Sequence, residues 1–266
     1  MNFLAAEVTY KAEDCQAFGV LRIKEVNIPT SVKSGEVNEI VLDCDFIADN
    51  ETGIVVKWFY NGDKDQIYQW IAGSNGTGSP MGSLKDYIDA SYKASNENIS
   101  MYRALKLVNV THKLTGSYSC KVTGDTDEIV QTKYLTIFVP PSEGLNLTVV
   151  RDDLSAICSV YGVFPEPKIS LYLQKQNHTN TTSQDRIEEE VSQDESFFNK
   201  TTILSFSNDT TSTPSHFVCE MSIPGTEYGI TEKRLFSIDN SSIQPHPSVF
   251  LLHSSLVLIF SILLKY

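Results

Sequence analysis

The sequence predicts an all-β protein built from two tandem β-sandwiches and followed by a hydrophobic C-terminal tail. Runs in which apolar and polar residues alternate recur between Gly, Asn and Asp residues, which is typical of half-buried strands joined by turns. Each half of the chain places two cysteines within such runs, and two adjacent prolines, Pro140 and Pro141, separate the halves. A chain of 266 residues is long enough for two sandwiches of about 100 residues each.

The first half carries the most specific motif. Cys44 lies in the alternating run 40–46, Trp58 follows it by fourteen residues, and Tyr118 precedes Cys120 by two. This combination resembles strands B, C and F of an immunoglobulin variable-type domain. The resemblance implies a disulfide between Cys44 and Cys120 that joins two sheets. It also implies that the indole of Trp58 packs against this bridge and that the Tyr118 hydroxyl anchors a corner.

Eight strands are expected in a first immunoglobulin-like, variable-type domain that spans residues 21–139. They lie near residues 21–28, 39–46, 54–60, 66–71, 86–92, 102–108, 116–123 and 129–139. Pro29 suits a sheet edge because proline has no amide hydrogen to donate to a ladder. The glycine-rich segment 73–82 is interpreted as a plain loop, because a phosphate-binding loop leads into a helix, whereas residues 86–92 alternate like a strand.

The second half repeats the pattern more weakly over residues 140–238. Cys158 and Cys219 lie in apolar runs, and a Phe-Pro turn at 164–165 leads to an alternating stretch at 168–174. These features resemble a constant-type immunoglobulin domain. The resemblance implies a second disulfide, between Cys158 and Cys219.

The second domain departs from the constant-type pattern in two positions. Leu171 or Leu173 stands where tryptophan is expected, and Phe217 replaces the corner tyrosine. An acidic run at 185–195 contributes to a net charge of −7 for residues 140–238, from 14 acidic and 7 basic side chains. This run lacks the spacing of a calcium-binding loop, so we interpret it as a solvated edge or loop.

Cysteine and asparagine usage both indicate an extracellular protein. Disulfides persist where thiols are oxidised, and closing loops of this length stabilises a domain by roughly 3 to 5 kcal/mol. Ten of the fifteen asparagines stand in Asn-x-Ser/Thr triplets, whereas chance would give about three. Besides Asn240, the glycosylation candidates are Asn50, Asn75, Asn98, Asn109, Asn146, Asn177, Asn180, Asn199 and Asn208. The fifth cysteine, Cys15, has no evident partner.

The two ends of the chain differ in what they indicate. Residues 1–20 lack the basic and apolar regions of a signal peptide, so we expect an incomplete or misassigned start. Residues 249–266 form an apolar tail, preceded at 239–248 by small residues and a polar spacer. This is the layout of a GPI-anchor signal, with attachment at Asn240 or Ser241. A short single-pass helix is the alternative, and both interpretations attach the C-terminus to a membrane.

Nothing in the sequence indicates catalysis, a metal or a cofactor. The five histidines are scattered without metal-ligand spacing, and no nucleophile or metalloprotease motif is present. The net charge of −12 and the lack of a clustered basic face argue against a nucleic-acid partner. We therefore expect a binding protein that needs no cofactor and is not an enzyme.

Alternation along two neighbouring strands predicts a binding face in the first domain. If Trp58 enters the core, Phe59 points outward, and the same alternation along the next strand displays Tyr68 and Trp70. The positions that this alternation buries are Ile67 and Ile71. Outward aromatic residues are anchors that protein interfaces favour. The alternative is that neighbouring loops cover the rings.

Several segments of the first domain are also similar to a known family. The segments that resemble the first domain of arthropod beaten-path-like cell-surface proteins are 21–29, 40–46, 55–62, 67–70 and 116–120. The resemblance implies a two-domain neuronal recognition protein that engages immunoglobulin-superfamily partners of the sidestep group on other cells. It further implies that Phe59, Tyr68 and Trp70 face the partner.

The leading hypothesis is a glycosylated recognition or adhesion protein on the extracellular face of the plasma membrane. Its first domain would bind another immunoglobulin-superfamily ectodomain, and the resemblance implies a role in axon guidance. The alternative is an anchored or secreted receptor for a small ligand or a microbial glycan, with a role in defence. That alternative requires an apolar pocket inside or between the domains, which the leading hypothesis does not need.

Overall fold

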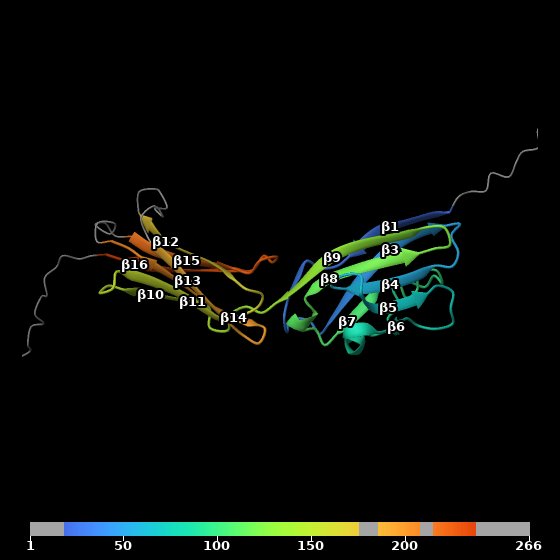
Figure 1. Ribbon diagram of the computed structural model, residues 1–266, viewed down its shortest axis with the longest axis horizontal. Coiled ribbons are helices and arrows are strands. Elements are labelled where there is room, and N and C mark those ends of the chain that lie inside the picture. The colour runs from blue at the N-terminus through green and yellow to red at the C-terminus, as the bar shows by residue number, and fades with distance from the viewer. Residues whose placement is uncertain (1–18, 176–185, 208–214, 238–266) are drawn as a thin grey trace, which may run out of the picture.

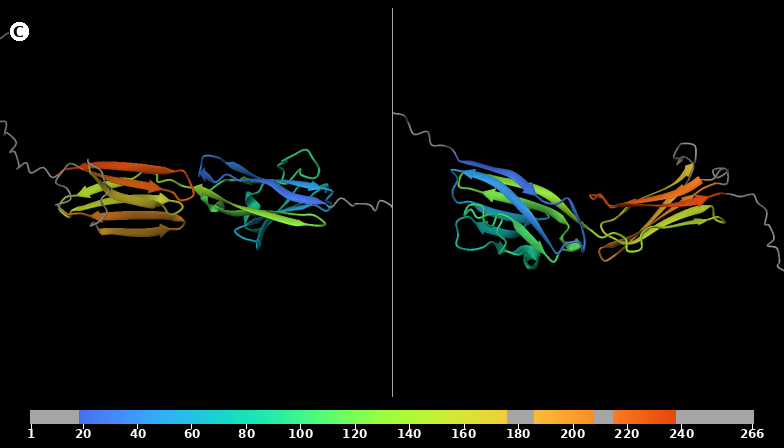
Figure 2. Two further views of the ribbon diagram at one scale, coloured as in Figure 1. Left: turned by 90° about the horizontal axis from the view of Figure 1, so that it is seen from above. Right: turned by 180° about the vertical axis from the view of Figure 1, so that it is seen from behind.

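The computed structural model describes residues 19–175, 186–207 and 215–237, and nearly all regular structure in these ranges is β-strand. The strands form two sandwiches that lie end to end (Figures 1 and 2). The buried core of the first sandwich draws on residues from Leu21 to Ile137, and that of the second on residues from Phe138 to Phe236. The prediction of two tandem immunoglobulin-like sandwiches is confirmed. The predicted apolar tail lies outside the described residues.

The first sandwich packs a six-stranded sheet against a three-stranded sheet. The larger sheet has the order β2-β9-β8-β4-β5-β6 and the smaller has the order β1-β3-β7. The pairing of β2 with β9 is parallel. The elements are β1 (Val20–Asn27), β2 (Ser31–Lys33), β3 (Glu39–Asp49), β4 (Val55–Tyr60), β5 (Asp65–Ile71), β6 (Ser79–Pro80), η1 (Gly82–Tyr87), β7 (Leu105–Val108), η2 (His112–Leu114), β8 (Gly116–Thr123) and β9 (Glu128–Phe138).

The core of the first sandwich surrounds the predicted disulfide. Cys44 on β3 is bonded to Cys120 on β8, with their Cα atoms 6.3 Å apart, so the bridge joins the two sheets. Trp58 pairs with Cys120 across β4 and β8 and is fully buried, and its indole N–H donates to the Arg103 carbonyl at 3.0 Å. The buried Tyr118 hydroxyl donates to a backbone carbonyl four residues earlier at 2.7 Å. The disulfide prediction is confirmed, and both aromatic side chains lie in the core.

Residues 86–92, which were predicted as a strand, do not form one. The chain makes a 3-10 helix over Gly82–Tyr87, and only Ile88 forms an isolated bridge. The turn into this helix requires Gly82, whose φ is +62° and where a Cβ would stand 2.6 Å from a backbone oxygen of Gln66. The backbone of this segment therefore follows from a left-handed glycine close to the neighbouring strand. The alternation of apolar and polar residues at 86–92 does not determine it.

The second sandwich packs a four-stranded sheet, β10-β11-β14-β13, against a three-stranded sheet, β12-β15-β16. The Cys158–Cys219 disulfide joins β11 to β15, with Cα atoms 6.4 Å apart, and this second predicted bridge is also confirmed. The strands are β10 (Asn146–Val150), β11 (Ser155–Val163), β12 (Lys168–Lys175), β13 (Arg186–Asp194), β14 (Phe197–Ser205), β15 (Ser215–Ser222) and β16 (Gly229–Phe236).

Strand register identifies which leucine takes the tryptophan position of the second domain. Leu171 pairs with Cys219, as the tryptophan of the first domain pairs with its second cysteine. Phe217 is buried, and its ring centroid lies 4.9 Å from that of Phe206 and 5.6 Å from that of Phe236. In the second domain, packing between aromatic rings therefore replaces the hydrogen bond that the tyrosine hydroxyl makes in a tyrosine corner.

The two sandwiches are connected by a short backbone pairing and by packed rings. Val139 and Phe164 exchange two backbone hydrogen bonds of 2.8 and 3.0 Å. The imidazole of His112, from the first sandwich, packs against the rings of Phe164 and Phe197 from the second, at centroid distances of 5.2 and 4.8 Å. These contacts form the domain junction.

The stability of the chain is expected to contain a pH-dependent part that comes from His112. Burial lowers the pKa of His112 below its ordinary value of about 6.5, and the neighbouring Lys113 lowers it further. A histidine with a lowered folded-state pKa binds protons more readily when unfolded. Its contribution is therefore complete above the unfolded pKa and is lost as the pH falls through that value toward the folded pKa.

Thermal unfolding of the chain and of a His112→Phe variant, between about pH 7 and about pH 5, measures this contribution. The phenyl ring keeps the aromatic packing but removes the titration, so the variant should lose less stability across this range. Equal pH dependence of the two proteins would show that His112 titrates alike in the folded and unfolded states.

Candidate functional site

The described residues contain no group of three or more His, Cys, Asp or Glu side chains placed to hold a metal ion. The part of the chain with described structure also has no helix long and apolar enough to cross a membrane. The predicted anchor positions Asn240 and Ser241, together with Cys15, lie outside the described residues. The candidate site described below is a surface of the first sandwich.

A β-bulge in β5 changes the predicted facing of its aromatic residues. Trp58 on β4 pairs with Tyr68, but the next residue, Phe59, pairs with Gln66, so Ile67 is an extra residue in β5. Ile67 and Tyr68 therefore both enter the core. Beyond the bulge, the alternation is shifted by one position.

Tyr68 and Trp70 are core residues, and their prediction as partner-facing side chains is wrong. They are 1% and 2% exposed, whereas Ile71, which was predicted to be buried, is exposed. The Tyr68 hydroxyl donates to the Tyr102 carbonyl at 2.8 Å, and Trp70 packs edge-on against the Tyr102 ring at 5.9 Å. Burial raises the pKa of Tyr68 well above its ordinary value. These side chains close the side of the core beside β5.

Phe59 does lie on the outer surface of the larger sheet, as predicted. Cross-strand pairing on this side of β4, β8 and β9 brings together a set of residues that we call the front face: Lys57, Phe59, Ser117, Ser119, Lys121, Val130, Thr132 and Tyr134. Its apolar side chains are the half-buried Phe59 and the exposed Val130 and Tyr134, at 59% and 57%. The sequence reasoning missed Val130 and Tyr134. The signal that could have identified them is their even spacing on the strand next to the one that carries Cys120.

The front face carries two lysines and no carboxylate among its own residues, although the whole chain has a net charge of −12. Lys57 and Lys121 pair across β4 and β8, and the Lys121 ammonium lies 5.8 Å from the centroid of the Phe59 ring. At the end of the face, Lys121 donates to the Glu128 carboxylate at 2.7 Å, and this hydrogen bond lowers the pKa of Glu128. Apolar side chains among cations suit a partner surface that is apolar and acidic.

The described glycosylation candidates differ in exposure, and their occupancy stays a prediction. Asn199 is half-buried, and its Oδ1 accepts a hydrogen bond from the Gly162 amide at 2.9 Å. The exposed candidates are Asn50, Asn75, Asn98, Asn109 and Asn146. The candidates that lie outside the described residues are Asn177, Asn180, Asn208 and Asn240.

One family model matches the first domain, and several solved structures are similar to the chain. Residues 19–140 match the family model of the CD47 immunoglobulin-like domain. Among solved structures, bovine butyrophilin is similar with a TM-score of 0.55 and 14% sequence identity, over 78% of this chain and 94% of that chain. The extracellular portion of mouse CD200RLa is similar with a TM-score of 0.47 and 15% identity, over 76% of this chain and 95% of that chain. Rst D1-D2 is similar with a TM-score of 0.47 and 17% identity, over 80% and 96%.

No curated protein matches the chain in sequence, and none of these matches points to the beaten-path-like family in particular. The first domain is of the variable type, by its family match and by its six-stranded sheet. With its two disulfide-linked sandwiches in tandem, the chain has the fold of the immunoglobulin superfamily.

Proposed function

We propose that this chain is a cell-surface recognition protein that binds the ectodomain of another protein through the front face. The observation that carries the proposal is the cluster of the half-buried Phe59 with the exposed Val130 and Tyr134, on a sheet that is tied to the core by a disulfide. Aromatic side chains on a rigid sheet supply contact area at a small loss of conformational entropy, which is why interfaces favour them.

The distribution of sequons supports the same face. The strands β4, β5, β8 and β9 contain no Asn-x-Ser/Thr triplet. The exposed sequons of the first domain, at Asn50, Asn75, Asn98 and Asn109, lie in connecting segments between strands. Glycans at these positions would leave the strands of the front face free of attached sugar, and a protein partner could approach them directly.

The finer parts of the proposal concern the partner and the membrane. The partner is another immunoglobulin-superfamily ectodomain, and the resemblance to beaten-path-like proteins favours the sidestep group and a setting in neuronal guidance. Attachment through a C-terminal GPI anchor at Asn240 or Ser241 would hold the chain on the extracellular face of the plasma membrane. Release of the chain from expressing cells by a phospholipase that cleaves such anchors would support this attachment, and retention would favour a membrane span.

The alternative function, as a receptor for a small ligand or a microbial glycan, requires an apolar pocket. The hollow of about 600 Å³ between the two sandwiches is lined by Pro29, Thr30, Ser31, Gly225, Thr226 and Glu227. Most of these side chains are small or polar, so this hollow gives the alternative no support.

Substituting the apolar residues of the front face is expected to weaken binding strongly. A screen of the chain against a panel of cell-surface ectodomains would supply the partner, and titration would then measure the affinity of each variant. Phe59→Ala and Tyr134→Ala should each weaken binding by about tenfold or more, because each removes a ring from the centre of the contact. The matched control is Tyr161→Ala, which removes from the second domain a ring about as exposed as that of Tyr134, at 53% against 57%, and should bind unchanged.

Trp70→Ala is unsuitable for this purpose, because the buried Trp70 supports the fold of the first domain. Unchanged binding by both Phe59→Ala and Tyr134→Ala would exclude the front face. Equal weakening by Tyr161→Ala would instead place the contact on, or extend it to, the second domain.

A further inference from the structure

Among the described residues, the second sandwich has no strand on the side where β5 closes the first sandwich. In the first domain, β5 pairs with β4 and supplies Ile67, Tyr68 and Trp70 to the core. In the second domain, β12 corresponds to β4, since Leu171 and Trp58 both pair with the second cysteine of their domain. The sheet order β12-β15-β16 makes β12 an edge strand, so one side of its backbone pairs with no described strand.

The edge strand of the opposite sheet, β13, also has one side that no described strand covers. In its register with β14, Ile187 lies opposite Leu204 and Val191 lies opposite Lys200, and both of these β14 side chains are buried. Ile187 and Val191 therefore point toward the inner side of the sandwich, yet each is 47% exposed. Covering two such aliphatic side chains would be favourable, because burial removes apolar surface from water.

Two polar groups on the inner side of β14 lie next to this opening. Thr202 is buried, and its hydroxyl has no hydrogen-bond partner among the described residues. The buried Lys200 ammonium lies 3.3 Å from Glu189 and 3.5 Å from Glu166. A buried hydroxyl without a partner is unfavourable, and a ligand that donates to it or accepts from it would remove this penalty.

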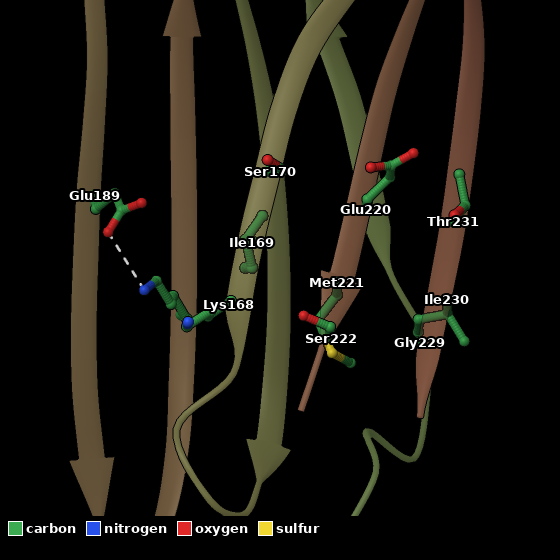
Figure 3. A pocket seen from close by; sticks show the side chains of 11 residues that line it. Lys168, Ile169, Ser170, Glu189, Glu220, Met221, Ser222, Gly229, Ile230 and Thr231 are labelled. Atoms are coloured by element: carbon green, nitrogen blue, oxygen red, sulfur yellow. Dashed lines mark ion pairs between the residues drawn. The ribbon is translucent and has the colours of Figure 1, made fainter. Parts of the chain in front are cut away.

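Two adjoining hollows follow the open side, and we call them together the second-domain groove. The larger has a volume of about 710 Å³ and is lined from β12, β13, β14, β15 and β16. The smaller, of about 440 Å³, shares Ile169 and Glu189 with it and extends to Ile187 and Thr202. Figure 3 shows Glu189 on the strand at one side, with its ion pair dashed, and Ile169 on a strand farther across.

We propose that the second-domain groove binds an extended segment of a partner protein, which adds to β12 as β5 adds to β4 within the first domain. Such a segment would hydrogen-bond to the side of β12 that pairs with no described strand, as strands that augment a sheet do. Its inward side chains would bury Ile187, which lines the smaller hollow, and Val191, which lies two residues beyond the lining residue Glu189 on the same side of β13. They would also give the Thr202 hydroxyl a partner. The groove lies in the other domain from the front face, so this proposal does not depend on the proposed function.

The charge of the groove favours a basic segment. The charged lining residues are Lys168, Lys200, Glu189 and Glu220. Glu166, outside the lining, lies 3.5 Å from Lys200, so three carboxylates face two cations at this site. Residues 140–238 have a net charge of −7, from 14 acidic and 7 basic side chains. A second copy of the chain is disfavoured as the occupant, because its β13 would bring glutamates from the run 188–190 to a site where carboxylates already outnumber cations.

The test uses the full chain, expressed with its glycans, and a fluorescent peptide of about ten residues in which lysine and valine alternate. We expect the peptide to bind with an affinity that falls as salt rises. It should bind about tenfold more weakly to the double variant Ile187→Asp, Val191→Asp. Both positions are exposed, so the fold should survive the substitutions. If the basic peptide were held only by non-specific charge attraction, the two added carboxylates would make it bind more tightly. The expected result is weaker binding, so the variant separates the two cases.

Leu235→Asp is the matched control, because Leu235 is an exposed aliphatic residue on β16 that lines neither hollow. It should bind the peptide as the unmodified chain does. Absence of binding, or equal binding by the double variant, overturns the proposal. Dimers in sedimentation that the double variant loses would identify a second copy as the occupant. Replacing residues 176–185 by a glycine-serine linker tests the chain's own segment as the occupant. If the peptide then binds more strongly, that segment competes for the groove. This result, like loss of the dimer, would overturn the proposal that a partner's strand binds there.

Discussion

Replacing Cys44 and Cys120 together by alanine is expected to lower the free energy of unfolding of the first domain by about 4 kcal/mol. The bridge joins residues with a sequence separation of 76, and in the chain-entropy model its removal stabilises the unfolded state by freeing that loop. A domain of this kind is stable by about 5 to 15 kcal/mol, so the loss would leave little or no stability at physiological temperature.

Tryptophan fluorescence during denaturant unfolding measures this loss in the first domain alone, because both tryptophans, Trp58 and Trp70, lie in its core. The matched control replaces Cys158 and Cys219 by alanine, whose sequence separation is 61. The control should shift the circular-dichroism signal of the second sandwich and leave the fluorescence midpoint nearly unchanged. A fluorescence midpoint that does not move in the first-domain variant would contradict the role assigned to its bridge.

Trp58→Ala is expected to destabilise the first domain by about 3 to 5 kcal/mol. The fully buried indole lies beside the disulfide, so its removal leaves a cavity that the bridged sheets cannot readily close. The substitution also removes the donor to the Arg103 carbonyl, which the indole N–H satisfies at 3.0 Å. Both effects act in the folded state.

The remaining Trp70 reports unfolding of the Trp58→Ala variant by fluorescence. Phe59→Ala is the neighbouring control, because its ring lies on the front face and its loss should reduce stability by under about 1 kcal/mol. If the two variants were equally stable, the packing described for β4 would be wrong. The same pair of variants separates fold from function, since only Phe59→Ala should weaken partner binding without unfolding the domain.

The covalent and most deeply buried parts of the fold could be predicted from the sequence. Cys44, Trp58, Tyr118 and Cys120 have residue types whose chemistry suits few other settings, and their spacing along the chain follows the strand order of the sandwich. Phe59 followed from Trp58 by simple alternation along one strand. The bridge and the two core aromatic residues were implied by the resemblance to a variable-type domain, whereas the position of Phe59 needed only alternation and the assumption that Trp58 is buried.

The predictions that were wrong concern places where backbone geometry, and not the alternation of side chains, determines the structure. The extra residue Ile67 in β5 places Tyr68 and Trp70 in the core, and one inserted residue leaves no mark in an apolar, aromatic stretch. The helix at Gly82–Tyr87 depends on a left-handed glycine close to a neighbouring strand. The second-domain groove depends on the lack of a described strand beside β12, and sequence patterns give no sign of a pairing that does not form among these residues.

Strand β9 connects the front face to the domain junction, and this continuity has a mechanical consequence. Tyr134 lies on β9, and Val139, which pairs with Phe164 of the second sandwich, follows directly after its end. Tension between a bound partner and the C-terminus would therefore run along the axis of β9. Its ladder with β8, from Gly116 opposite Leu135 to Thr123 opposite Glu128, would be loaded in shear. Bonds loaded in this way must break together, so the molecule is suited to bear a pulling load without unravelling strand by strand.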